Sequence, residues 1–318
     1  METGNAIRMS VLFTFPGQGS QRAGMLHALP AHPETQGTLL QAADILQRDP
    51  LQLDTLAALA ASQSVQLCLL IAGVAMTRVF AAYGLHADMV AGLSIGAYPA
   101  AVAAGSLAYE DALRLVALRG RIMDARYPRG YGMSAIIGLE RLQLEPLIAR
   151  IHADGTPVYL ANLNARRQLV IAGTEEGMRA VMQLAIAAGA SKAERLAVSV
   201  PSHCSLFDEE AIVMQQAFAK VAMQRPRLTY LSGSTARAMR DPAQIADDLA
   251  CNLARQIHWD DTVQLAWERG ARLALEMPSN TVLTGLAQAI FVEGHAVACE
   301  GNQLETLLTL IAREQKTQ

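Results

Sequence analysis

Met89-Val90-Ala91-Gly92-Leu93-Ser94-Ile95-Gly96 is the stretch of sequence that decides the fold. It joins an apolar run of strand character to an alanine-rich run of helical character through a Gly-x-Ser-x-Gly turn. A serine at such a turn projects its hydroxyl away from the backbone, and the glycines allow a tight turn and close approach of a substrate. The helix that follows directs free N–H groups at any oxyanion formed there. Taken alone, the turn fits a serine nucleophile and an idle serine about equally well.

The composition predicts a protein with a large core. The chain has 318 residues, enough for one large domain or two unequal ones, and 52% of them are hydrophobic against 17% charged. A formal charge of −3 gives no reason to expect nucleic acid or an anionic membrane as a partner. The four cysteines are scattered, with neither metal-ligand spacing nor a disulfide framework, which favours a cytoplasmic location.

The apolar stretches predict buried segments and no targeting or membrane segment. Residues 1–8 are mixed and polar, and the apolar run that follows them is too short for the core of a signal peptide. The longest apolar stretch, Leu67 to Ala82, is interrupted by Thr77 and Arg78 and is shorter than a membrane span. We therefore expect a buried helix there.

The first part of the chain has the pattern of a parallel α/β unit. Val11 to Phe15 is a predicted strand that ends at a Pro-Gly-Gln-Gly turn, and Met89 to Ala91 is a second one. Helical segments lie between them, including one expected from Asp54 to Ala61. Strands that alternate with helices predict a parallel sheet covered by helices. Functional residues collect at the carboxyl ends of such strands, where Gln18 and Ser94 fall.

A second, smaller unit is predicted in the middle of the chain. Its strand–helix–strand–strand–helix–strand order is the split pattern of a ferredoxin-like unit. The predicted elements are Met133 to Leu139, Leu144 to Ala153, Val158 to Leu163, Gln168 to Ala172, Gly177 to Gly189 and Ala193 to Val200. The sequence thus predicts an α/β protein whose hydrolase-like large subdomain, residues 1–128 and 198–318, has a parallel sheet. The inserted ferredoxin-like small subdomain is residues 129–197.

A serine nucleophile needs a base to take its proton, and seven histidines are available. His203 stands out because a strand end meets a proline-marked turn in Ser199-Val200-Pro201-Ser202-His203-Cys204, the same kind of place as Ser94. His258, beside Trp259, is a more ambiguous candidate. The residues alone leave the choice of base open.

Four motifs, in this order, resemble the malonyl-CoA:acyl-carrier-protein transacylases of fatty-acid and polyketide synthesis. One of them would be weak evidence, whereas all four in order are highly specific. The similarity runs from about Leu12 to Leu286. The motifs are Phe15-Pro16-Gly17-Gln18-Gly19-Ser20-Gln21, the Gly92 to Gly96 turn, Leu118-Arg119-Gly120-Arg121-Ile122-Met123 and Val200-Pro201-Ser202-His203-Cys204.

The resemblance implies a catalytic role for several residues. Ser94 would be the acylated nucleophile and His203 its general base, oriented by a main-chain carbonyl at the position that Asn252 occupies. The family often has glutamine at that position, and a carbonyl contact tolerates the exchange. The main-chain N–H groups of Gln18 and Ile95 would form the oxyanion hole.

The resemblance also implies how the acyl group is bound. Arg119 would bind the free carboxylate of malonate, because a guanidinium grips a planar carboxylate with two parallel hydrogen bonds. Without the motif, an arginine on an apolar helix would be taken for a snorkelling surface residue. Met123, Gln66 and Asn162 match positions that line or brace the acyl and pantetheine pocket, although each would equally serve as a core or capping residue.

The partners implied are malonyl-CoA and an acyl-carrier protein that presents a phosphopantetheine-type thiol. No metal or redox cofactor is implied. Acyl transfer through a serine ester also requires that water be kept out, so we expect a narrow, largely apolar cleft between the two subdomains. Lys192 and Arg195, which precede the His203 segment, would either meet an acidic carrier protein or be ordinary surface cations.

The chain departs from the common family pattern next to the serine. The usual turn is Gly-His-Ser-Leu-Gly-Glu, whereas this chain has Leu93 and Ala97 in place of the histidine and the glutamate. Met277-Pro278-Ser279-Asn280 also replaces the usual Gly-Pro-Gly turn. This version looks like the epsilon subunit of biotin-independent malonate decarboxylase, whose acceptor would be a phosphoribosyl-dephospho-CoA thiol on a dedicated carrier subunit.

Three alternatives remain at this point. The chain would be the malonyl transacylase of fatty-acid or polyketide synthesis, a serine hydrolase, or a non-catalytic subunit that only docks a carrier protein. Hydrolases with this turn usually have an acidic third residue, and no convincing one lies near His203 in the sequence.

Overall fold

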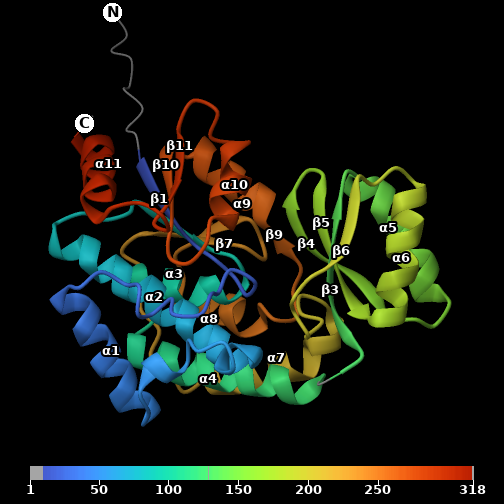
Figure 1. The fold of residues 1–318 in the computed structure, drawn as a ribbon, viewed down its shortest axis with the longest axis horizontal. Helices are drawn as coiled ribbons and strands as arrows, with labels where there is room; N and C mark the ends of the chain where they lie inside the picture. Colours follow the sequence, from blue (N-terminus) through green and yellow to red (C-terminus); the bar gives the residue numbers. More distant parts are fainter. Residues whose placement is uncertain (1–9, 128, 317–318) are drawn as a thin grey trace, which may run out of the picture.

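The computed structural model describes residues 10–127 and 129–316, which form two sheets with helices packed on them (Figure 1). The strands are β1 (Ser10–Phe15), β2 (Met89–Gly92), β3 (Tyr131–Ile137), β4 (Val158–Ala165), β5 (Gln168–Thr174), β6 (Lys192–Arg195), β7 (Thr229–Ser232), β8 (Arg237–Met239), β9 (Ile257–His258), β10 (Ala271–Glu276) and β11 (His295–Ala298). The α-helices are α1 (Pro33–Leu46), α2 (Ser62–Ala82), α3 (Ala97–Ala103), α4 (Tyr109–Arg126), α5 (Arg141–Ala153), α6 (Glu175–Ala187), α7 (Asp208–Phe218), α8 (Pro242–Cys251), α9 (Trp259–Glu268), α10 (Val282–Gln288) and α11 (Leu304–Lys316).

The larger sheet confirms the predicted parallel α/β architecture. Its strand order is β11-β10-β1-β2-β7-β8, and every pairing from β11 to β7 is parallel, while β8 runs antiparallel to β7. The strands β1 and β2 are neighbours at its centre, with Phe15 opposite Gly92 at their carboxyl ends. The two turns that the sequence singles out, after Phe15 and after Gly92, therefore leave the same edge of the sheet side by side.

Alternation along the central strand explains why helices cover both faces of this sheet. In β1, Val11, Phe13 and Phe15 belong to one buried cluster, and Leu12 belongs to another. The first cluster includes residues of α2, α4, α8 and α11, and the second includes residues of α9 and α10. Successive side chains of a strand point to opposite faces, so a strand this apolar has to be buried on both.

Helix α2 is the main core helix of the first face. It spans 21 residues with a mean hydropathy of 1.9 in its most apolar window, so by length and composition alone it would cross a membrane. The sequence predicted an apolar stretch from Leu67 to Ala82 that is shorter than a membrane span. The length was wrong, because the helix already begins at Ser62. The expected burial is present, since 78% of that window is buried inside the protein.

The smaller sheet has the order β6-β3-β5-β4-β9. Its first four strands pair antiparallel, and α5 and α6 pack on it around a core of their own (Figure 1). Along the chain these elements follow the strand–helix–strand–strand–helix–strand order. The fifth strand, β9, comes from beyond residue 198 and pairs parallel with β4. The division into residues 1–128 with 198–318 and residues 129–197 stays a prediction.

Two expected elements differ from the observed ones. The segment from Asp54 to Ala61 forms turns and a short 3-10 helix at Ala58–Ala60, not an α-helix. The strand expected from Ala193 to Val200 ends at Arg195. Its pairing with β3 covers only Lys192 to Arg195. Beyond it, the carbonyls of Leu196 and Val198 accept hydrogen bonds from the Arg195 guanidinium and not from a neighbouring strand.

Candidate active site

The Ser94 turn is held in place by close backbone contacts. Ser94 has a φ of 54°, in the left-handed region that costs a residue with a side chain free energy. A Cβ at Gly96 would collide with the carbonyl oxygen of Phe15, and one at Gly92 would collide with Gly96. The N–H of Leu93 donates to the same Phe15 carbonyl at 2.9 Å. These contacts lock the serine against the end of β1, so the glycines at both ends of the motif are required by space.

His203 lies in hydrogen-bond contact with Ser94. Its Nε2 is 2.8 Å from the Ser94 Oγ, and its Nδ1 is 2.8 Å from the carbonyl oxygen of Asn252 and 3.2 Å from that of Arg255. A carbonyl oxygen only accepts hydrogen bonds, so Nδ1 carries the proton and Nε2 is free to accept the serine proton. The His203 N–H donates to the Leu253 carbonyl at 2.6 Å, which ties both sides of the histidine to the segment after α8.

The surroundings of His203 keep it neutral. Its side chain is 2% exposed. Burial, and next the positive charge of Arg119, lower the pKa of His203 from 6.5 to about 4, while the two carbonyl hydrogen bonds oppose this shift. An imidazole with this pKa is deprotonated throughout the neutral range and can act as a base there.

We expect the rate of acyl transfer to fall only when the pH approaches about 4. Because the base must be neutral, initial kcat/KM measured from pH 7 downward should stay level and then fall as the pH passes through about 4. The lowered pKa also means that the unfolded chain binds this proton more readily, so His203 destabilises the fold as the pH falls from 6.5 toward 4. Circular dichroism at each pH separates the two effects. A midpoint near 6.5 in folded protein would contradict the assignment.

Arg119 is a buried cation beside the serine. It is 1% exposed, and its Nη2 donates to the Ser94 Oγ at 3.4 Å and to the Asn252 Oδ1 at 3.2 Å. Its Nη1 donates to the Gln66 Oε1 at 2.7 Å, and the Gln66 Nε2 in turn contacts the Met123 Sδ at 3.4 Å. Its Nε has no hydrogen-bond partner. Burial lowers the pKa of the guanidinium.

Gly120 allows Arg119 to lie beside Ser94. Arg119 is on α4, which packs on α2, the helix of Gln66. A Cβ at Gly120 would collide with the backbone of Gln63 on α2, so the two helices approach this closely only because residue 120 has no side chain. The sequence motif around Arg119 therefore contains both the cation and the residue that lets it reach the serine.

We expect Gly120→Ala to destabilise the fold and to weaken acyl transfer. Forcing a methyl group into a packed contact costs about 1–3 kcal/mol, and the shift of α4 would move Arg119. Gly37→Ala is the matched control, since Gly37 lies in α1 with open space around its Cβ position and alanine there favours the helix. Thermal unfolding compares the two variants. Equal Tm values would show that the α2–α4 contact is not tight.

The predicted oxyanion donors lie at adjacent strand ends. Gln18 follows β1 and Ile95 follows Ser94 at the end of β2. Among the turn and loop hydrogen bonds within residues 10–127 and 129–316, none uses the N–H of Gln18 or of Ile95. The Gln18 side chain donates to the Ser62 Oγ at 3.3 Å, which anchors this loop to the start of α2.

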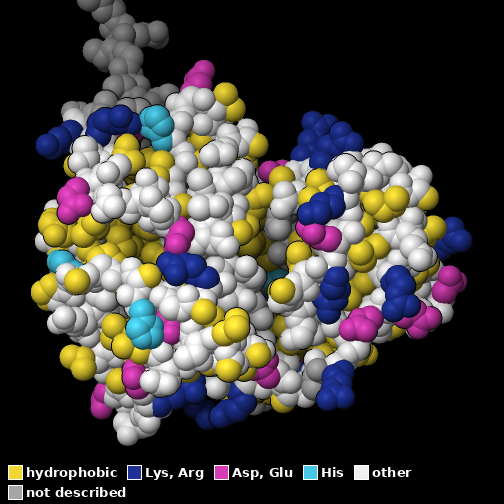
Figure 2. Space-filling model, viewed as in Figure 1, with side chains coloured by type: hydrophobic (Ala, Val, Ile, Leu, Met, Phe, Trp, Pro, Cys, Tyr) yellow, Lys and Arg dark blue, Asp and Glu magenta, His cyan; other side chains and the backbone are white. Residues whose placement is uncertain are grey.

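Gln18, Ser94 and His203 border a cleft of about 250 Å³ between the two sheets, whereas Ile95 and Arg119 lie behind its lining. Figure 2 shows the surface hollowed between the larger and the smaller lobe, with hydrophobic side chains along the hollow. Residues from both sheets line the cleft: Gln18, Leu93, Ser94, Met123, Met133, Asn162, Asn164, Gln168, Leu196, Val198, His203, Val282 and Leu283 are among them.

Two side chains of this wall were missed by the sequence reasoning. Asn164 and Gln168 line the cleft together with the predicted Asn162. The period of a strand was the available signal, because Asn164 lies two residues after Asn162 on β4 and so faces the same side. The Oδ1 atoms of Asn162 and Asn164 are buried and have no hydrogen-bond partner, so the cleft offers two free acceptors to a bound molecule.

The other predicted candidates lie apart from this cluster. His258 is on β9, where its Nδ1 is 3.7 Å from Asp261, and it does not line the cleft. Lys192 pairs with Glu194 at 2.7 Å. The Arg195 guanidinium donates to the carbonyls of Tyr131, Met133, Leu196 and Val198. It therefore braces the chain where it enters and leaves the smaller sheet.

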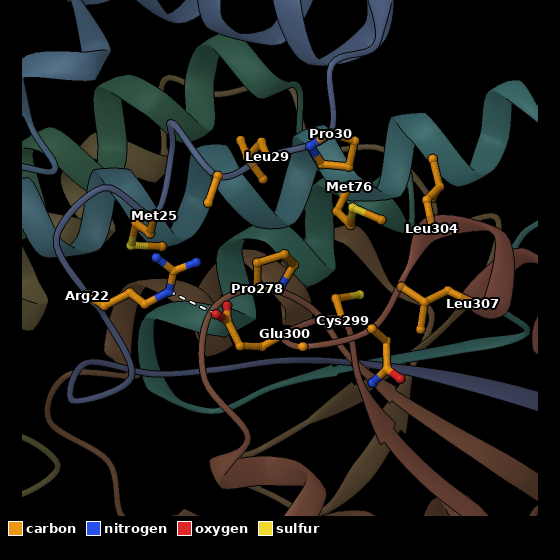
Figure 3. A pocket seen from close by; sticks show the side chains of 13 residues that line it. Arg22, Met25, Leu29, Pro30, Met76, Pro278, Cys299, Glu300, Leu304 and Leu307 are labelled. Atoms are coloured by element: carbon orange, nitrogen blue, oxygen red, sulfur yellow. Dashed lines mark ion pairs between the residues drawn. The ribbon is translucent and has the colours of Figure 1, made fainter.

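Figure 3 shows the side chains that line a second cavity, of about 150 Å³. Arg22 and Glu300 form an ion pair of 2.9 Å beside it, and Met25, Met76 and Pro278 contribute to its wall. It contains none of the predicted site residues. The ion pair ties the loop that follows Gln18 to the segment after β11.

A serine and a histidine in contact at the carboxyl edge of a parallel sheet, with a buried cation beside them, form the site of a nucleophilic-serine enzyme. Within the described ranges, no group of three or more His, Cys, Asp or Glu side chains comes together as a metal site. The chain matches the family model of the acyl transferase domain over residues 12–317. The protein belongs to this acyl transferase family.

Several relatives and solved structures resemble the chain over nearly its full length. The malonyl CoA-acyl carrier protein transacylase of Salmonella typhimurium is 35% identical over 284 residues, which cover 87% of this chain and 92% of that protein. The transacylase structure from Coxiella burnetii has a TM-score of 0.91 at 34% identity and covers 97% of this chain and 99% of its own. A malonyl-transacylase in complex with a type II PKS acyl-carrier protein has a TM-score of 0.89 at 33% identity, covering 96% and 99%.

Proposed function

We propose that this protein transfers a malonyl group from malonyl-CoA to the thiol of an acyl-carrier protein through a malonyl ester of Ser94. The observation that carries the proposal is the buried guanidinium of Arg119, 3.4 Å from the Ser94 Oγ. No carboxylate pairs with it among the residues described, and its Nε is unsatisfied. A buried cation of this kind favours a ligand that brings a carboxylate, as a malonyl group does.

In the first half of the reaction, Ser94 becomes acylated. The Ser94 Oγ gives its proton to the Nε2 of His203 and forms a bond to the thioester carbonyl carbon of malonyl-CoA. The resulting oxyanion accepts hydrogen bonds from the N–H groups of Gln18 and Ile95. The carbon–sulfur bond then breaks, and CoA leaves as a thiol with the proton from His203. Arg119 holds the free carboxylate of the malonyl ester.

In the second half, the carrier thiol takes the place of CoA. It gives its proton to His203, its sulfur bonds to the ester carbon, and the bond from that carbon to the Ser94 Oγ breaks. The Oγ takes the proton back from His203, which restores the starting state. The Asn252 carbonyl holds the imidazole through both halves. Met123, Gln66 and Asn162 line or brace the bound acyl and pantetheine groups.

We also propose that the physiological acceptor is the carrier subunit of malonate decarboxylase, so that this chain is its epsilon subunit. Leu93 and Ala97, beside the nucleophile, support the finer assignment, because they resemble that branch and replace two polar groups of the common turn. Leu93 lies in the cleft wall, where it offers a carrier arm an apolar contact. A cytoplasmic location, with four buried free thiols, fits this role.

Mass spectrometry after mixing with malonyl-CoA tests the acylation step. We expect an adduct on Ser94 that disappears when a carrier thiol is added and appears on the carrier. Rapid release of free malonate without an acceptor would favour a serine hydrolase, and no adduct at all would favour a subunit that only docks the carrier.

A competition between two holo carriers, each with a free thiol, tests the finer assignment. The holo carrier subunit of malonate decarboxylase and the holo carrier protein of fatty-acid synthesis are supplied at equal concentration with the acylated protein. Preferential transfer to the first supports the epsilon-subunit assignment. Preferential transfer to the second replaces it with a transacylase of fatty-acid synthesis.

A further inference from the structure

A buried carboxylate lies on the inner face of α8, outside the cleft. Asp248 is 1% exposed, and its Oδ1 accepts hydrogen bonds from the Ser232 Oγ at 2.7 Å and from the Ser234 Oγ. Its Oδ2 accepts one from the Tyr230 hydroxyl at 3.0 Å. Among the ion pairs of the described residues, none includes Asp248, so its hydrogen bonds come from three neutral hydroxyls, while the positive charge of Arg255 acts on it only at longer range.

Packing alone does not account for a carboxylate at this place. Burial raises the pKa of Asp248, and the hydrogen bonds from the three hydroxyls oppose this shift. A buried charge carries a large desolvation cost, and well-packed apolar residues in its place are often neutral or stabilising. What an apolar side chain does not provide is a set of directed bonds that fixes one element relative to another.

The elements that Asp248 joins both lead to the active site. Tyr230 and Ser232 are on β7, which pairs in parallel with β2, the strand that ends at the Ser94 turn. On the other side, Asp248 precedes Asn252, the C-terminal cap of α8, by one helical turn. The position of α8 relative to β7 therefore determines where Asn252 lies relative to Ser94.

The position of α8 matters because Asn252 contacts both His203 and Arg119. Its carbonyl oxygen accepts from the His203 Nδ1 at 2.8 Å, and its side-chain Oδ1 accepts from the Arg119 Nη2 at 3.2 Å. The next carbonyl, of Leu253, accepts from the His203 N–H. A second tie supports the same helix, since the Tyr98 hydroxyl on α3 donates to the Leu249 carbonyl at 3.1 Å.

We propose that Asp248 is a positioning residue, whose three hydroxyl partners hold α8 on β7 so that Asn252 orients both His203 and Arg119. The inference rests on the proposed acyl transfer in that these two residues act as base and carboxylate clamp. It assigns Asp248 no contact with the substrate.

Asp248→Ala should therefore impair two properties together. A misplacement of about 1 Å costs on the order of 10²-fold in rate, so we expect acylation of Ser94 to slow by about 10- to 100-fold per folded molecule. The preference for malonyl-CoA over acetyl-CoA should fall as well, because a displaced Asn252 no longer holds the Arg119 Nη2 in place. Rapid-quench acylation with each acyl-CoA measures both. The rate of Ser94 sulfonylation by phenylmethylsulfonyl fluoride, in which the serine oxygen displaces fluoride, reports on the Ser94–His203 pair without any malonyl group.

Two variants separate positioning from stability. Asp248→Asn keeps an acceptor for the two serines and a polar contact for Tyr230, so it should restore most of the acylation rate and of the malonyl preference. Asp241→Ala is the matched control on the same helix, because Asp241 caps the opposite end of α8 by accepting from the Gln244 N–H at 2.9 Å. It should lower the Tm and leave the malonyl preference unchanged.

The outcomes are decisive in both directions. Wild-type acyl preference in folded Asp248→Ala, or the same loss of preference in Asp241→Ala, overturns the inference. If Asp248→Ala does not fold, Tyr230→Phe removes one donor and should produce the same two changes in weaker form, and an unchanged preference there overturns it too. Failure of the proposed function looks different, because the wild-type protein would then form no malonyl adduct while phenylmethylsulfonyl fluoride still labelled Ser94.

Discussion

We expect Ser94→Ala to abolish acyl transfer, with a loss in kcat on the order of 10⁴–10⁶-fold. The alanine variant retains the cleft, His203 and Arg119 but has no oxygen to carry the malonyl group. Mass spectrometry should find no adduct, whereas malonyl-CoA should still bind, with a dissociation constant close to its wild-type value.

Ser205→Ala is the control for this variant, because Ser205 is exposed and lies just beyond His203 in the sequence. It should form the adduct at the wild-type rate. An adduct that persists in Ser94→Ala would move the acylated residue elsewhere in the chain and contradict the mechanism.

We expect Arg119→Ala to lose malonyl transfer while acetyl transfer survives or rises. Truncating one partner of a buried, hydrogen-bonded charge pair costs about 2–5 kcal/mol, and 1.4 kcal/mol corresponds to tenfold, so kcat/KM for malonyl-CoA should fall by about 10²–10³-fold. Acetyl-CoA has no carboxylate to lose, and the smaller side chain frees the pocket. Steady-state kinetics with both acyl-CoAs gives the ratio.

Two further variants sharpen this result. Arg121→Ala, on the same helix but exposed, should leave the ratio unchanged. Arg119→Lys keeps the charge but not the planar fork, so it should recover only part of the malonyl rate. If Arg119→Ala reduced malonyl and acetyl transfer equally, Arg119 would be a structural residue and not a carboxylate clamp.

The sequence was sufficient for the features that local rules determine. Gly92 and Gly96 mark the serine turn because the backbone contacts there exclude a side chain. The alternation of strands and helices predicts the parallel sheet, whose neighbouring strands β1 and β2 then place Gln18 and Ser94 at one edge. Their juxtaposition with His203 and Arg119 followed from the resemblance, since 109 residues separate His203 from Ser94.

Features that depend on the packing of distant elements could not be predicted. The Arg255 carbonyl lies 3.2 Å from the His203 Nδ1. It is a main-chain group, so the identity of the side chain at position 255 does not predict this contact. Nothing in the sequence distinguishes Asp248 from other acidic residues, because its hydroxyl partners on and after β7 are brought to it only by the packing of α8 on that strand. Strand β9 was missed because only two residues pair, and they pair with a strand almost a hundred residues away.

The unpaired charge of Arg119 has a consequence for the order of events on the enzyme. After burial, this cation is the second cause of the low pKa of His203. In the proposed mechanism, the carboxylate of a bound malonyl group would offset the charge of Arg119, so the pKa of the imidazole would rise as the substrate binds. An acyl group without a carboxylate would leave this pKa low. The same contact would therefore select the substrate and make His203 a stronger base, which would reduce the acylation of Ser94 by other acyl-CoAs.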